Sequence, residues 1–126
     1  MAWYKTIFSS PYFSDRTLVT CGGTQEDAVD DAFILWSKSL GIGGGGFGSI
    51  PRTKSCVELP ADARIFRMAY KLPNEDRERI IVVSALSLED ARDECMAEIY
   101  KIIGPGWTNM TSGIKMIPTE VYLEEI

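Results

Sequence analysis

Two stretches of the chain repeat apolar residues every four positions, the spacing that lines one face of an α-helix. Thr24 and Ser87 precede these stretches, and their hydroxyls can accept from the free N–H groups of a first helical turn. Gly41 and Gly104 follow them, as is common where a helix ends. We therefore predict amphipathic helices over 24–41 and 87–104. Their buried faces are Ala28, Ala32, Trp36 and Leu40 in the first, and Ala91, Cys95, Ile99 and Ile103 in the second.

Runs rich in β-branched and aromatic residues predict strands before and after each helix. The predicted strands are residues 2–9, 16–21, 55–59, 64–72, 79–85 and 119–125, with a further short strand at 113–117. The run 79–85 is apolar at successive positions, so both of its faces are expected to be covered. We therefore expect it to be a central strand.

The second half of the chain repeats the pattern of the first at an offset of 87 − 24 = 63 residues. Residues 16–43 and 79–106 align without a gap, and nine of these 28 pairs are identical, including Arg16 with Arg79. Unrelated pairing at ordinary composition gives about two identities. This favours a tandem duplication, with a first ββαβ unit at 1–60 and a second at 61–126. The alternative is that any strand, cap, helix and glycine unit shares these features.

Only a few residues link the two halves, and a unit of about 60 residues is marginal alone. We therefore expect one domain over residues 1–126, in which the halves share one core and one sheet system. The predicted class is α+β, with two helices packed on an antiparallel or mixed sheet. The nearest common architecture is a distantly ferredoxin-like one.

The chain has 126 residues, a net charge of −5 and no histidine. Without histidine, Ser–His and Cys–His nucleophilic catalysis and most transition-metal sites are excluded. The acidic balance argues against nucleic acid as a partner, because that affinity depends on clustered lysine and arginine. Carboxylate chemistry assisted by Tyr100 or Lys101 stays open, so an enzyme is a disfavoured third hypothesis. No catalytic residue, cofactor or metal is predicted.

Cys21, Cys56 and Cys95 form no CxxC pair, which is typical of reduced thiols in a cytoplasmic protein. The longest apolar run, 80–86, is far shorter than the roughly 20 residues that span a bilayer. The N-terminal residues lack the apolar core of a signal peptide. We expect a cytoplasmic protein without a membrane partner.

The glycine-rich segment GIGGGGFGSIPR, residues 41–52, raises the question of a phosphate site. A phosphate-binding loop runs from a strand into a helix N-terminus, where free N–H groups and the positive dipole end meet the anion. This segment instead leaves the negative end of a helix. A mobile connection and a recognition surface remain as its two interpretations.

The recognition hypothesis combines this segment with its counterpart after the second helix. Aromatic, cationic and amide side chains in the two segments suit a protein contact or a small anion. The candidate binding residues are Phe47, Arg52, Lys54, Trp107, Asn109 and Lys115. Acidic residues at both helix starts could hold a divalent cation, but solvated helix starts explain them better.

The leading functional hypothesis is a small non-enzymatic binding protein that recognises another protein through the two post-helix segments. An inhibitor or adaptor fits this description, and its size and charge are compatible with a viral or mobile-element origin. The alternative is a protein that binds or sequesters a nucleotide or other anion, including as a homodimer. In that case Arg52 and Lys54 would hold the anion, and Trp107 or Phe47 would stack on the ring.

Overall fold

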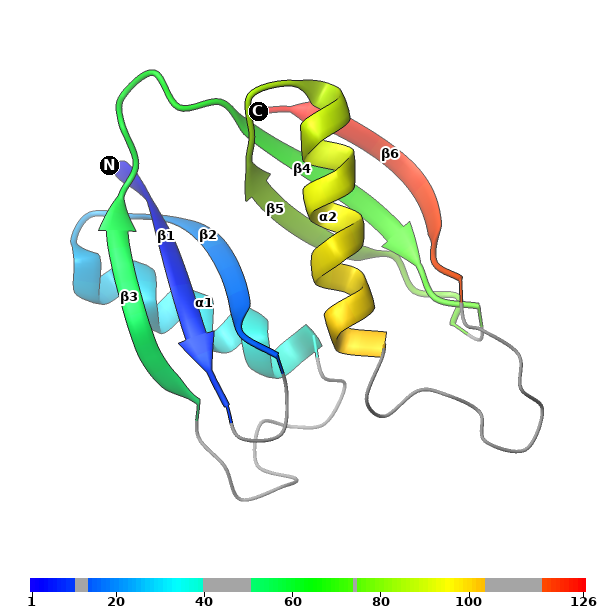
Figure 1. Ribbon diagram of the computed structural model, residues 1–126, viewed down its shortest axis with the longest axis horizontal. Helices are drawn as coiled ribbons and strands as arrows, with labels where there is room; N and C mark the ends of the chain where they lie inside the picture. Colours follow the sequence, from blue (N-terminus) through cyan, green and yellow to red (C-terminus); the bar gives the residue numbers. More distant parts are fainter. Residues whose placement is uncertain (11–13, 40–50, 74, 104–116) are drawn as a thin grey trace. The chain divides into compact units, whose positions relative to one another are not determined.

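The computed structural model describes residues 1–10, 14–39, 51–73, 75–103 and 117–126, and it is an α+β structure. The chain divides into two compact units, Met1–Ala63 and Arg64–Ile126 (Figure 1). Each unit contains one three-stranded antiparallel sheet and one helix. The elements of the first are β1 (Ala2–Ser9), β2 (Arg16–Gly22), α1 (Gln25–Ser39) and β3 (Arg52–Glu58). Those of the second are β4 (Ile65–Lys71), β5 (Arg79–Ser84), α2 (Leu88–Ile103) and β6 (Thr119–Glu125).

In the first unit β1 is the middle strand, in the order β2-β1-β3. Both neighbours run antiparallel to β1, with Thr6 opposite Leu18 on one side and opposite Cys56 on the other. Residues on alternate positions of a strand face opposite sides of the sheet. Thr6 and Phe8 are buried and therefore mark the face that α1 covers.

The core of the first unit lies between this face and the apolar stripe of α1. Phe8 and Leu18 of the sheet pack with Ala32 and Trp36 of the helix, and Phe33 packs against them with its ring 6.3 Å from that of Trp36. Ala32 has no exposed surface. A small side chain there lets the helix approach the sheet closely, while Trp36 fills the space beside it.

The second unit has the strand order β5-β4-β6, again with its first strand in the middle. The helix α2 lies along one face of this sheet (Figure 1). Its residues Ala91, Cys95 and Ile99 are fully buried. They pack on a set of sheet and adjoining residues: Phe66, Met68, Tyr70, Leu72, Ile81 and Val83. This is the larger of the two cores.

The predicted helix caps are confirmed in both units. The backbone N–H of Asp27 donates to Thr24 Oγ1 over 3.2 Å, and that of Asp90 donates to Ser87 Oγ over 3.1 Å. Each hydroxyl thus satisfies one donor that a first helical turn would otherwise leave unpaired. No helix among the described residues is both long and apolar enough to cross a membrane.

The structure corrects three predictions about the strands. The described strands form two separate sheets in place of the one sheet system we expected. The run 79–85 was expected to be central, but β5 is an edge strand and half of the Ile80 surface is exposed. Apolar residues on successive positions cannot tell a covered strand from one with an open face. The strand predicted at 55–59 begins earlier, at Arg52.

Other sequence predictions keep their earlier standing. The strand predicted at 113–117 falls outside the described residues except for Ile117, which is not in a strand. The boundary between the units follows Ala63, close to the predicted boundary after residue 60. That the two halves form a single domain stays a prediction.

Gly22, which ends β2, provides a test of the tight connection from β2 to α1. A Cβ atom there would lie 3.0 Å from the backbone nitrogen of Ala28 and 3.1 Å from the carbonyl oxygen of Thr24. We therefore expect Gly22→Ala to destabilise the protein by about 1–3 kcal/mol, the usual cost of overpacking. Urea unfolding measures this change.

The neighbouring glycine supplies the matched control. A Cβ on Gly23 would meet only the Asp27 carboxylate, at 3.8 Å, so Gly23→Ala should leave stability nearly unchanged. Equal unfolding midpoints for the two variants would show that the helix does not pack against Gly22 as described.

Candidate functional site

Two of the six predicted binding residues, Arg52 and Lys54, lie among the described residues. Both are on β3, which directly follows the glycine-rich segment in sequence, and both side chains are exposed. Phe47, Trp107, Asn109 and Lys115 lie outside the described residues. The structure therefore places the end of the candidate surface in the first unit, on the sheet edge that β3 forms.

Lys54 is already engaged within its own unit. Its Nζ donates to Asp15 Oδ2 over 2.8 Å, and this hydrogen bond raises the pKa of Lys54. Both side chains are largely exposed, so the pair contributes little to stability. It does offset the charge that an anion would meet at Lys54. No ion pair involves Arg52 among the described residues, so Arg52 is the better candidate to bind an anion.

Exposed apolar side chains lie on the elements that flank the glycine-rich segment. Ile34 and Leu35 are both exposed on the second half of α1, and Val57 is more than half exposed on β3. Isolated exposed apolar residues are ordinary on protein surfaces. Here they stand on both elements that the segment connects. Sequence reasoning overlooked Ile34 and Leu35, which lie off the four-residue stripe of the helix and so carried a signal.

The second unit has the same feature around its own post-helix segment. Tyr100 is nearly half exposed in the last part of α2, and Ile117 is exposed just before β6. Both units therefore carry exposed large apolar side chains on either side, in sequence, of the segment that follows the helix. Tyr100 and Lys101 were the candidate proton-transfer residues. Lys101 Nζ instead donates to the buried carboxylate of Glu98 over 3.0 Å.

The acidic residues of β6 are paired with arginines of the same unit. Three arginines, from α2, β4 and the residue before β4, each contact one glutamate. The pairs are Arg92 with Glu120, Arg67 with Glu124 and Arg64 with Glu125. The strand consequently presents little uncompensated negative charge, despite three glutamates in seven residues.

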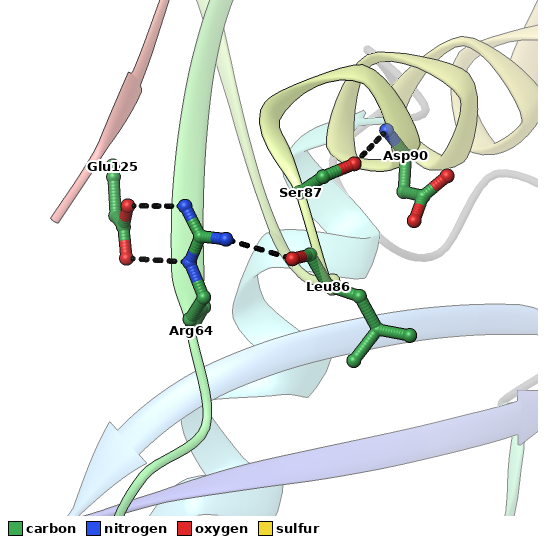
Figure 2. A network of polar contacts seen from close by, with 5 residues as sticks. All are labelled: Arg64, Leu86, Ser87, Asp90 and Glu125. Carbon is green, nitrogen blue, oxygen red and sulfur yellow. Dashed lines mark hydrogen bonds and ion pairs between the residues drawn. The ribbon is translucent and has the colours of Figure 1, made fainter.

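Figure 2 shows how Arg64 joins three elements of the second unit. Two of its nitrogens donate to the Glu125 carboxylate over 2.8 and 3.0 Å, and a third donates to the carbonyl oxygen of Leu86 over 2.7 Å. The next residue, Ser87, caps α2. The guanidinium also lies over the Phe66 ring, 5.2 Å from its centre. Its donors are occupied by these structural contacts.

A second arginine, Arg79, is buried at the start of β5, with only 6% of its side chain exposed. It donates to both carboxylate oxygens of Glu75, over 2.7 and 2.8 Å. This hydrogen bonding is the main cause that lowers the pKa of Glu75 below its ordinary value of 4.5. Arg16, at the start of β2, is buried as well. Both arginines therefore belong to the structural framework.

The described residues contain no group of three or more acidic or cysteine side chains placed to hold a metal ion. The three cysteines are free thiols. Cys95 is fully buried in the core, and this burial is the main cause that raises its pKa to about 12. A thiol with so high a pKa is a poor nucleophile. Cys56 Sγ accepts the hydroxyl of Thr6 over 3.4 Å.

Comparison of the chain with protein-family models, with curated proteins and with solved structures found no match. Its function therefore has to be inferred from the residues themselves.

The pair of Glu75 and Arg79 predicts an acid-sensitive contribution to stability. The folded-state pKa of Glu75 is lowered, so its contribution is present above pH 4.5 and is lost as the pH falls through the folded-state pKa. Glu75→Gln should lower stability at pH 7 by about 1.5–3 kcal/mol, the range for hydrogen bonds to charged groups. The difference from wild type should shrink at acid pH, as urea unfolding at several pH values would show.

Glu124→Gln is the matched control, because it removes the carboxylate of a pair that is nearly half exposed on both sides. Its effect at pH 7 should be the smaller of the two. A difference between wild type and Glu75→Gln that stays constant down to the lowest pH would contradict the assignment.

Proposed function

We propose that this protein is a small non-enzymatic binding protein that recognises another protein through the two segments that follow its helices. The observation that carries this proposal is the length of those segments. The chain uses 52 − 39 − 1 = 12 residues between α1 and β3, and 119 − 103 − 1 = 15 between α2 and β6. A helix packs about 10 Å from its neighbour, a gap that about three extended residues cross. The excess length is typical of functional connections.

The residues around these segments support a protein partner. Interfaces between proteins are enriched in aromatic residues and arginine, and a few such side chains carry most of the binding energy. Phe47 and Trp107 lie in the segments, and Arg52 follows the first of them. The exposed Leu35 and Tyr100 add apolar surface on the helices before the segments.

A small anion such as a nucleotide is the second candidate ligand. The exposed guanidinium of Arg52, at the end of the glycine-rich segment, favours it, because arginine can hold a phosphate or carboxylate by two hydrogen bonds. The engagement of Lys54 by Asp15 weakens it, since only one of the two predicted cations is then available. For this reason we favour the protein partner.

We further propose that the two units descend from one duplicated ancestral half with a distantly ferredoxin-like arrangement. The offset of 63 residues supports this, together with the shared order of two strands, a helix and a strand. Under this proposal the two post-helix segments are equivalent parts, and an inhibitor or adaptor would use them together. A cytoplasmic location is proposed as well, because three free thiols suit a reducing compartment.

The test is affinity capture from the native host with the full chain as bait, followed by identification of the proteins and metabolites recovered. Trp107→Ala and Arg52→Ala should lose the specific protein partner. Leu88→Ala should retain it, because Leu88 is an exposed residue at the opposite end of α2 from the post-helix segment. Circular dichroism checks that each variant is folded.

Two outcomes would redirect the proposal. Full retention of the partner by Trp107→Ala and Arg52→Ala together would move the site elsewhere. A nucleotide that co-purifies and raises the melting temperature would favour the anion, since ligand at 100 times its Kd adds about 2.7 kcal/mol of stability.

A further inference from the structure

The outer edge of β5 is unusually open to pairing with another strand. Among the described strands β5 has one neighbour, β4, so its other side is an edge. Proteins usually protect such edges with charged side chains or cover them, because unpaired N–H and C=O groups invite further pairing. Residues 80–86 of this edge carry no charge, and half of the Ile80 surface is exposed.

The other edge strands differ from β5 in this respect. The strand β6 carries three glutamates, and β3 carries Arg52, Lys54 and Glu58. On β3 the Cys56 carbonyl also accepts from Gln25 Nε2 over 2.6 Å. The strand β2 is uncharged after Arg16, but none of its residues is exposed. Only β5 combines an uncharged edge with an exposed large apolar side chain.

The register of the sheet shows which backbone groups of β5 point outward. The N–H of Ala85 donates to the carbonyl of Arg64 in the β4 direction, over 3.2 Å. In an antiparallel ladder, alternate residues direct their N–H and C=O groups to opposite sides. Ile80, Val82 and Ser84 therefore point these groups away from β4. Their side chains lie on the face opposite the core, since Ile81 and Val83 belong to the core.

We propose that β5 pairs antiparallel with β5 of a second copy of this chain, so that two three-stranded sheets become one of six strands. The twofold axis passes through a pair of Val82 residues, and each Ile80 lies opposite the partner copy's Ser84. This proposal concerns an edge distinct from the post-helix segments, so it does not depend on the proposed function.

Charge favours a second copy as the occupant of this edge. With Val82 opposite Val82, paired positions add to 164, so Glu78 lies opposite Leu86 and Arg77 opposite Ser87. No like charges meet directly, which would destabilise a sheet. The pairing also brings two copies of Ile80 and Val82 together on one face. Leu86, which is 86% exposed in the single chain, comes to lie beside the partner strand. An isologous contact of this kind closes after two copies.

Sedimentation velocity of the full chain over a range of concentrations tests the proposal. Wild type should show a reversible monomer–dimer equilibrium. Val82→Glu places two carboxylates opposite each other at the axis and should raise the dimer Kd by about tenfold or more. Within its own sheet Val82 lies opposite Arg67, so the variant should still fold, as circular dichroism would show.

Val57→Glu is the matched control, because Val57 is an exposed valine on another edge strand and lies opposite a basic residue, Lys5. It should dimerise like wild type. Hydrogen exchange adds a second readout, in which the amides of Ile80, Val82 and Ser84 become slower to exchange as concentration rises. A chain that stays monomeric throughout, a Val82→Glu dimer as stable as wild type, or exchange at these amides that is independent of concentration would each overturn the proposal.

Discussion

The structure depends on the packing of one helix against one face of a three-stranded sheet, which occurs once in each unit. The helices make this contact with small side chains, Ala28 and Ala32 in α1 and Ala91 and Cys95 in α2, all without exposed surface. Small residues let the helix backbone approach the sheet, and the sheet then supplies the large side chains, such as Phe8 and Phe66. Each core is thus closed mainly by its sheet.

The same packing determines where the chain is free to vary. The strands β2 and β3 are both antiparallel to β1 and lie on either side of it, so the chain must cross over the sheet between them. The helix makes this crossing. Its 15 residues span about 22 Å, close to the length of a seven-residue strand. The connection before the helix is tight at Gly22, whereas the connection after it has length to spare for recognition.

Much of this arrangement could be predicted from the sequence, because the signals are local. The four-residue stripe and the hydroxyl caps identified both helices, and β-branched runs identified all six strands. Whether a strand is central could not be predicted, since the open face of β5 is as apolar as its covered face. Of the site, Arg52 and Lys54 were identified, but the pairing of Lys54 with Asp15 joins residues 39 positions apart and left no local signal.

The central claim is that β1 and β4 are the middle strands of two separate sheets. Nuclear Overhauser effects between backbone protons of neighbouring strands test it most directly. The structure predicts contacts from β1 to both β2 and β3, including Thr6 with Cys56, and from β4 to both β5 and β6, including Met68 with Leu123. Contacts from β1 or β4 to a single neighbour, or direct pairing of β2 with β3, would contradict it.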